Sequence, residues 1–129
     1  MVNRSFRFHA CGRRRFSRAY HALRVVLHAL RDRLTVEEAV QLGAQLPMLV
    51  RGFYYEGWNP AGKPAKAHRA EFLDTIRSGF RPQEDADAER IARAVFKVVA
   101  AHISEGEIRD VKQILPKDLR ALWPRPWWD

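Results

Sequence analysis

The chain has 129 residues, of which 47% are hydrophobic, and its formal net charge is +8. This length fits one domain, and the hydrophobic fraction is sufficient for a single core. A lone cysteine, Cys11, excludes an internal disulfide and is typical of a reducing compartment. The longest hydrophobic stretches are far shorter than the roughly 18–20 residues that a membrane-spanning helix needs, so we expect a cytoplasmic protein with no membrane span.

The positive charge is concentrated in residues 1–18, which contain six arginines and no acidic residue. These arginines are Arg4, Arg7, Arg13, Arg14, Arg15 and Arg18. In the rest of the chain 17 basic residues face 15 acidic ones, so the sequence predicts a basic N-terminal arm on a body of ordinary charge. The arm lacks the roughly 7–15-residue apolar core of a secretory signal. Its composition suits an organelle transit peptide, a disordered arm or a misplaced start codon.

Helical periodicity begins at Phe16, and hydrophobic residues recur from there at spacings of three and four, which predicts a long first helix. They are Tyr20, Leu23, Leu27, Leu30 and Leu34. The Thr35 hydroxyl can accept a hydrogen bond from the amide of Glu38, while the Glu38 carboxylate accepts one from the amide of Thr35. This reciprocal arrangement, a capping box, predicts the start of a second helix.

The second helix is predicted to end at the Leu46-Pro47 junction. Proline has no amide hydrogen and its ring clashes with a preceding helical turn, so Pro47 is predicted to be the first residue of a third, shorter helix. Residues 56–66 then contain two glycines and two prolines, which indicates a connecting loop.

The second half of the chain shows the same kinds of signal. Residues 72–80 have helical periodicity, and Ser78-Gly79 closes that helix. Acidic residues within 84–89 lie before and in the first turn of the next helix, where the helix dipole favours negative charge. That helix, over residues 91–102, is hydrophobic around more than half of its circumference and is predicted to be the central core helix.

Residues 21–54 and 90–123 align without a gap at an offset of 69. The matched positions include Thr35 and Ser104, Glu38 and Glu107, Leu46-Pro47 and Leu115-Pro116, and Arg51 and Arg120. These matches fall at helix caps and junctions, where residue choice has a physical basis, so we interpret the alignment as an internal repeat. The predicted fold is all-α, a single helical-bundle domain made of two related three-to-four-helix units with pseudo-two-fold symmetry.

The predicted units are residues 19–55 and 67–123, joined by the loop 56–66 and followed by an aromatic tail over 124–129. The core that the two units share is predicted to contain Leu27, Leu30, Leu42, Val95, Val98 and Val111.

The pattern of a long helix followed by Leu-Thr-x-x-Glu-Ala and Ala-Gln-Leu-Pro returns as Ile-Ser-x-Gly-Glu and Gln-Ile-Leu-Pro. Over residues 19–123 this pattern resembles the bacterial family catalogued as domain of unknown function 2267. The resemblance implies a duplicated all-helical fold and supplies no activity, cofactor or catalytic residue. The chain departs from the family pattern at its start, where an acidic amphipathic helix would stand and where residues 6–15 are rich in arginine. Residues 67–80 supply that helix for the second unit.

Candidate metal-binding and catalytic groups are few. His21 and His28 could share a helix face, but no carboxylate at helical spacing joins them as a third ligand. Capping and the helix dipole explain the acidic residues at helix starts, and no phosphate-binding loop, nucleophile elbow or triad spacing is present. We therefore predict no metal, no cofactor and no catalytic residue, and an unrecognised enzyme is the third interpretation.

An aromatic cluster ends each unit. Tyr55, Trp58, Trp127 and Trp128 lie in Gly- and Pro-rich or terminal segments, where exposed aromatic residues are frequent anchors of interfaces. These four residues are the candidate partner surface. They favour a non-catalytic helical binding or scaffolding module with an unknown protein partner.

The alternative is weak, sequence-nonspecific nucleic-acid binding through the arm. Its six arginines are the candidate contacts to phosphates or other anions, and Phe6, Phe8 and Phe16 could stack on bases. Anionic lipid head groups would satisfy the same charge.

Overall fold

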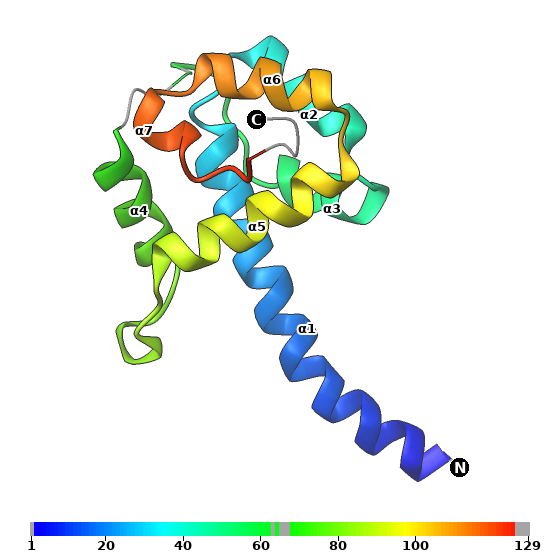
Figure 1. Cartoon of the computed structure of the whole chain (residues 1–129). Coiled ribbons are helices and arrows are strands. Elements are labelled where there is room, and N and C mark those ends of the chain that lie inside the picture. The colour runs from blue at the N-terminus through cyan, green and yellow to red at the C-terminus, as the bar shows by residue number, and fades with distance from the viewer. Residues whose placement is uncertain (1, 63, 65–67, 126–129) are drawn as a thin grey trace.

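The computed structural model describes residues 2–62, 64 and 68–125, with side chains described from Ser17 onward. This part of the chain is helical and contains no β-strand, which confirms the predicted all-α class (Figure 1). The elements are α1 (Val2–Arg31), α2 (Val36–Gln45), α3 (Met48–Tyr55), α4 (Arg69–Ser78), the 3-10 helix η1 (Pro82–Glu84), α5 (Ala88–His102), α6 (Glu105–Ile114) and α7 (Lys117–Arg120). No helix in the described ranges has both the length and the hydrophobicity needed to cross a bilayer.

Helix α1 is longer than its hydrophobic pattern predicts. The periodicity begins at Phe16, whereas the backbone is helical from Val2. The C-terminal half of α1 lies within the body formed by α2–α7, and the N-terminal half extends away from that body (Figure 1). Hydrophobic periodicity reports only the turns that pack on a core, so it does not mark the part of α1 that projects beyond the core.

The core lies where α1 and α5 pack against each other and against the shorter helices. Helix α1 contacts α3, α4 and α5, while α2 contacts α3 and α6. The predicted core residues are buried except for Val98, whose side chain is 54% exposed. That prediction was wrong because the buried face of α5 is formed by residues 88, 92, 95, 96 and 99, which leaves position 98 on its flank.

The two predicted capping boxes are half formed. Thr35 Oγ1 accepts from the amide of Glu38 at 3.2 Å, and Ser104 Oγ accepts from the amide of Glu107 at 3.1 Å. The return bond is not made at the second cap, because the Ser104 amide donates to Gln45 Oε1 at 2.8 Å. Helix α2 packs against α6, and the side chains of Glu38 and Glu107 are buried, with 8% and 5% exposure. The two carboxylates were predicted to accept hydrogen bonds from the N-cap amides. They are instead buried where α2 packs on α6.

The ends of α2 and α6 are closed by arginines that are 69 residues apart. Pro47, predicted to be the first residue of the third helix, is instead the N-cap of α3 with an extended ψ of 152°. Arg51 donates to the carbonyl oxygens of Ala44 and Leu46 at 2.9 and 3.0 Å. Arg120 makes the corresponding two bonds at the end of α6, at 3.2 and 2.9 Å. Each arginine thus satisfies carbonyl groups that a helix end leaves free.

The two hydroxyl caps are expected to contribute equally to stability. Thr35→Ala and Ser104→Ala should each lower the free energy of unfolding by about 0.5–2 kcal/mol, because each removes one hydrogen bond to a helix N-terminus. Urea denaturation of the two single variants measures both costs. A difference of more than about 1 kcal/mol between them would show that the two caps are not equivalent.

Candidate functional site

An open hydrophobic groove lies between α1 and α5, at the place where α1 leaves the body. Its volume is about 420 Å³. The groove is lined by Ala19, Tyr20, Ala22, Leu23, Ile91, Ala94, Val95 and Val98. Only Tyr20 among these lining residues has an ionisable side chain. A surface of this composition is suited to binding hydrophobic side chains rather than to acid–base or nucleophilic chemistry.

Helical spacing explains why these residues share the groove. On α1, Ala19 and Leu23 are one turn apart, and on α5, Ala94 and Val98 are one turn apart. Tyr20 is 38% exposed and packs on Phe53, with ring centroids 5.3 Å apart. The other helices cover only part of α1 around residues 19–23. The uncovered part of the hydrophobic stripe of α1 therefore lines the groove.

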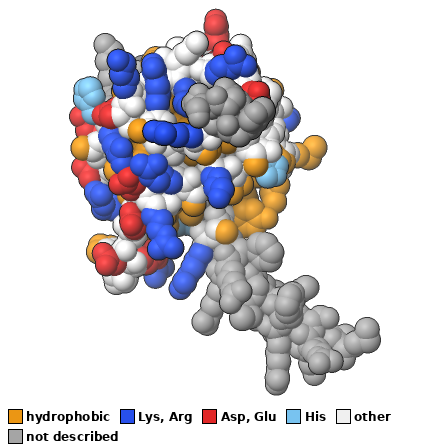
Figure 2. Space-filling model, viewed as in Figure 1, with side chains coloured by type: hydrophobic (Ala, Val, Ile, Leu, Met, Phe, Trp, Pro, Cys, Tyr) orange, Lys and Arg blue, Asp and Glu red, His pale blue; other side chains and the backbone are white. Residues whose placement is uncertain are grey.

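The hydrophobic surface continues past the groove toward the start of α3. A smaller hollow is lined by Leu23, Leu46, Pro47, Val50, Val98, Val99 and His102. Close by in sequence, Met48 and Leu49 are 86% and 58% exposed. Hydrophobic side chains gather at one edge of the visible face of the body, and Lys and Arg side chains cover much of the rest of this face (Figure 2).

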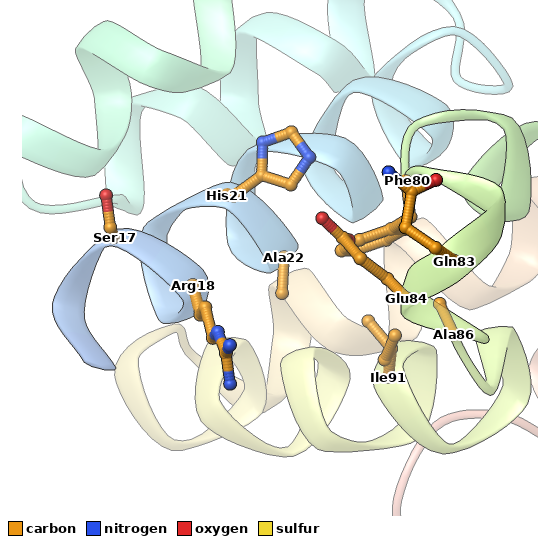
Figure 3. A pocket seen from close by; sticks show the side chains of 9 residues that line it. All are labelled: Ser17, Arg18, His21, Ala22, Phe80, Gln83, Glu84, Ala86 and Ile91. Carbon is orange, nitrogen blue, oxygen red and sulfur yellow. The ribbon is translucent and has the colours of Figure 1, made fainter. Parts of the chain in front are cut away.

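A more polar cavity of about 690 Å³ adjoins the groove and shares Ala22 and Ile91 with it (Figure 3). Arg18 and His21 enter this cavity from α1, and Glu84 enters it from η1. The His21 ring is fixed by a 2.7 Å contact between Nε2 and the carbonyl oxygen of Gly79. The combined site therefore has a hydrophobic part and a polar part with charges of both signs.

Positive charge flanks the groove along α5. Arg90 and Lys97 lie one turn before and one turn after Ala94, and both are exposed. Neither forms an ion pair with any residue in the described part of the chain. By contrast, Glu89 pairs with Arg93 and Arg69, and these hydrogen bonds hold the pKa of Glu89 below its ordinary value. The cations beside the groove are thus available to an acidic ligand.

The histidines considered as metal ligands bond to the backbone. His28 Nε2 lies 2.5 Å from the carbonyl oxygen of Phe53, in addition to the contact of His21 with Gly79. Burial lowers the pKa of His28, an effect that the bond to Phe53 partly opposes. At the end of α5, His102 Nδ1 lies 2.8 Å from the carbonyl oxygen of Val98. These contacts give each histidine a structural role.

The predicted aromatic surface is only partly described, because Trp127 and Trp128 lie outside the described residues. Tyr55 and Trp58 are half-buried, and their ring centroids are 5.7 Å apart. Tyr55 also packs so closely on Gly43 that a Cβ there would clash with its phenol group. The partner surface proposed for these four residues stays a prediction.

The predicted anion contacts are also partly described. Arg18 is exposed and lines the polar cavity. The side chains of Arg4, Arg7, Arg13, Arg14 and Arg15 lie outside the described side chains. Sequence reasoning missed the groove because it assigned Val98 to the core. A prediction that placed only the face with residues 88, 92, 95, 96 and 99 in the core would have assigned Ala94 and Val98 to the surface.

The comparisons with known proteins identify the family of the chain. No curated protein matches it. A family model described as an uncharacterized conserved protein (DUF2267) matches residues 9–122. The match includes every residue that lines the groove, and it begins at residue 9 rather than at residue 19 as predicted. Because the match covers most of its length, the chain belongs to the DUF2267 family.

Proposed function

We propose that the protein is a non-catalytic binding module that holds an amphipathic helix of a protein partner in the groove between α1 and α5. The observation that carries this proposal is the exposed hydrocarbon surface of the groove, which includes Val98 at 54% exposure. Grooves of this kind take up the hydrophobic face of a helix in many complexes.

The packing of α4 supports a helix as the occupant. Positions 21, 25, 29 and 33 form one row on α1 at one-turn spacing, and α4 and the residues after it contact this row at three of the four positions. His21 contacts the carbonyl oxygen of Gly79, and Val25 lies against Gly79 so closely that a Cβ there would clash. Arg33 donates to Thr75 Oγ1 at 3.3 Å. A row with this spacing on a helix is therefore a surface on which a second helix can pack.

The corresponding row of α5 is exposed. If residues 21–54 and 90–123 are two copies of one unit, the four positions correspond to Arg90, Ala94, Val98 and His102, all of which are exposed. Ala29, which corresponds to Val98, is only 2% exposed. At the offset of 69, positions 71–78 of α4 correspond to residues 2–9, which are the first turns of α1 and extend away from the body (Figure 1). We propose that a partner supplies the missing helix.

The positive charge beside the groove indicates which residues the partner helix has on its polar face. Arg90 and Lys97 on α5 and Arg18 on α1 lie beside the hydrophobic floor of the groove. An occupant with hydrophobic residues at one-turn spacing and acidic residues on the flanking face would satisfy both features. Such charge complementarity raises the association rate and disfavours basic partners.

A peptide based on α4 tests this proposal. The peptide comprises residues 68–80 with Arg69→Glu and Arg77→Glu, which adds acidic charge to a helix that already packs on α1. In an NMR titration of the full chain, it should shift resonances of Leu23, Ala94 and Val98. Val98→Lys should weaken its binding at least about tenfold, because a charge replaces the central hydrophobic contact.

Val36→Lys is the matched control, since Val36 is 41% exposed on α2, away from the groove. This variant should bind the peptide as the unchanged protein does. Neither variant should lower the melting temperature appreciably, because both side chains are exposed. Equal binding by Val98→Lys and the unchanged protein would refute the docking site.

A further inference from the structure

Three carboxylates meet where α2 packs on α6. Glu38 and Glu107 occupy equivalent positions, each three residues after the N-cap of its helix, and Asp110 is one turn further along α6. One carboxylate oxygen from each of the three residues lies within 4.8 Å of the other two. Glu38 and Glu107 are more than nine-tenths buried, whereas Asp110 is exposed.

One oxygen of each buried carboxylate lacks a partner. Neither Glu38 Oε1 nor Glu107 Oε1 has a hydrogen-bond partner, although both atoms are inaccessible to solvent. No Lys, Arg or His in the described residues forms an ion pair with any of the three acids. Burying a carboxylate without compensation is costly, so a proton or a cation is needed between these groups.

We propose that Glu38, Glu107 and Asp110 bind a divalent cation, with Ca²⁺ as the ion that fits best. Carboxylate oxygens are ligands for hard cations, and the absence of histidine and cysteine from the cluster disfavours zinc. Ca²⁺ binds oxygen at about 2.3–2.6 Å in a flexible geometry, so three oxygens within 4.8 Å of one another can bind a single ion. Mg²⁺ demands near-ideal octahedral geometry and gives up its water ligands reluctantly, so we expect it to bind this cluster more weakly than Ca²⁺.

The third carboxylate favours a cation over a shared proton alone. One proton between Glu38 and Glu107 neutralises a single charge and leaves Asp110 beside a negatively charged pair. Asp110 is exposed, so an ion can reach the cluster from solvent on the side where Asp110 lies.

A bound cation would join α2 to α6, and so the first half of the chain to the second. The groove between α1 and α5 contributes none of the three ligands. The cation site therefore goes beyond the proposed docking function and can be tested separately.

The experiment uses the full chain, first treated with EDTA and then dialysed into metal-free buffer at pH 8. We expect CaCl₂ at saturation to raise the melting temperature by at least about 3 °C, because the ion binds the folded state and not the unfolded chain. Calorimetric titration should give one site per chain, and MgCl₂ should bind more weakly. Asp110→Asn should weaken Ca²⁺ binding at least about tenfold without unfolding the protein, since Asp110 is exposed.

Glu107→Gln should abolish the response to Ca²⁺, while Glu105→Gln, which changes an exposed acid in the same first turn of α6, should keep it. Absence of a Ca²⁺ response in the unchanged protein would overturn the proposal and leave a shared proton as the only compensation. An equal response in Asp110→Asn would overturn it as well. Binding of the helical peptide to the groove should not change in any of these cases.

Discussion

Phe96→Ala is expected to lower the free energy of unfolding by about 3–5 kcal/mol, the range for removing a fully buried aromatic side chain. Phe96 is 1% exposed and lies between two other rings. Its ring stacks on Trp123 with centroids 4.4 Å apart and an interplanar angle of 4°, and Phe72 is 6.1 Å away. The substitution removes this stacking and leaves a cavity beside Phe72 and Trp123, which close packing of the core keeps from collapsing fully.

Urea denaturation followed by far-UV circular dichroism measures this loss. Val98→Ala is the control on the same helix, and it should cost less than about 1 kcal/mol because Val98 is 54% exposed. Phe96→Leu should have an intermediate effect, since it keeps part of the buried volume. Similar costs for Phe96→Ala and Val98→Ala would mean that the buried face of α5 is not the one described above.

Features set by local chemistry could be predicted from the sequence. The hydroxyl caps at Thr35 and Ser104 and the boundary at Leu46-Pro47 depend on residues within one or two turns. The structure has both caps at the expected residues and begins α3 one residue later than predicted. The all-α class follows from the same signals, because periodicity and caps agree along most of the chain.

Features set by contacts between distant segments could not be predicted in this way. Val98 has the spacing of a core residue, but its exposure depends on which side of α5 is covered by α1 and α4. Similarly, helix capping is a sufficient reason for the presence of Glu38 and Glu107 at helix starts, so the sequence gives no local sign that the two side chains are buried. Their burial together depends on the packing of α2 against α6. The offset of 69, which aligns Glu38 with Glu107, was the available signal, because equivalent residues would meet at the axis if the two segments formed the predicted two-fold repeat.

In the presence of EDTA, the protein is expected to lose stability as the pH rises from 7 to 9. Burial first, and then the hydrogen bond and charge of Glu38, raise the pKa of Glu107 from 4.5 to about 8. Between these values the folded protein holds a proton that the unfolded chain has released. Each pH unit therefore lowers the free energy of unfolding by up to about 1.4 kcal/mol. The stabilisation is complete below about pH 4.5 and is lost as the pH rises through about 8.

Glu107→Gln should remove this dependence, because its amide can donate a hydrogen bond to Glu38 at every pH and so imitates the protonated acid. Urea denaturation at pH 7, 8 and 9 should give a nearly constant free energy of unfolding for this variant and a falling one for the unchanged protein. Glu105→Gln should retain the falling profile. A falling profile in Glu107→Gln would place the responsible proton elsewhere. If Ca²⁺ also flattens the profile of the unchanged protein, the cation and the proton compete for the same carboxylates.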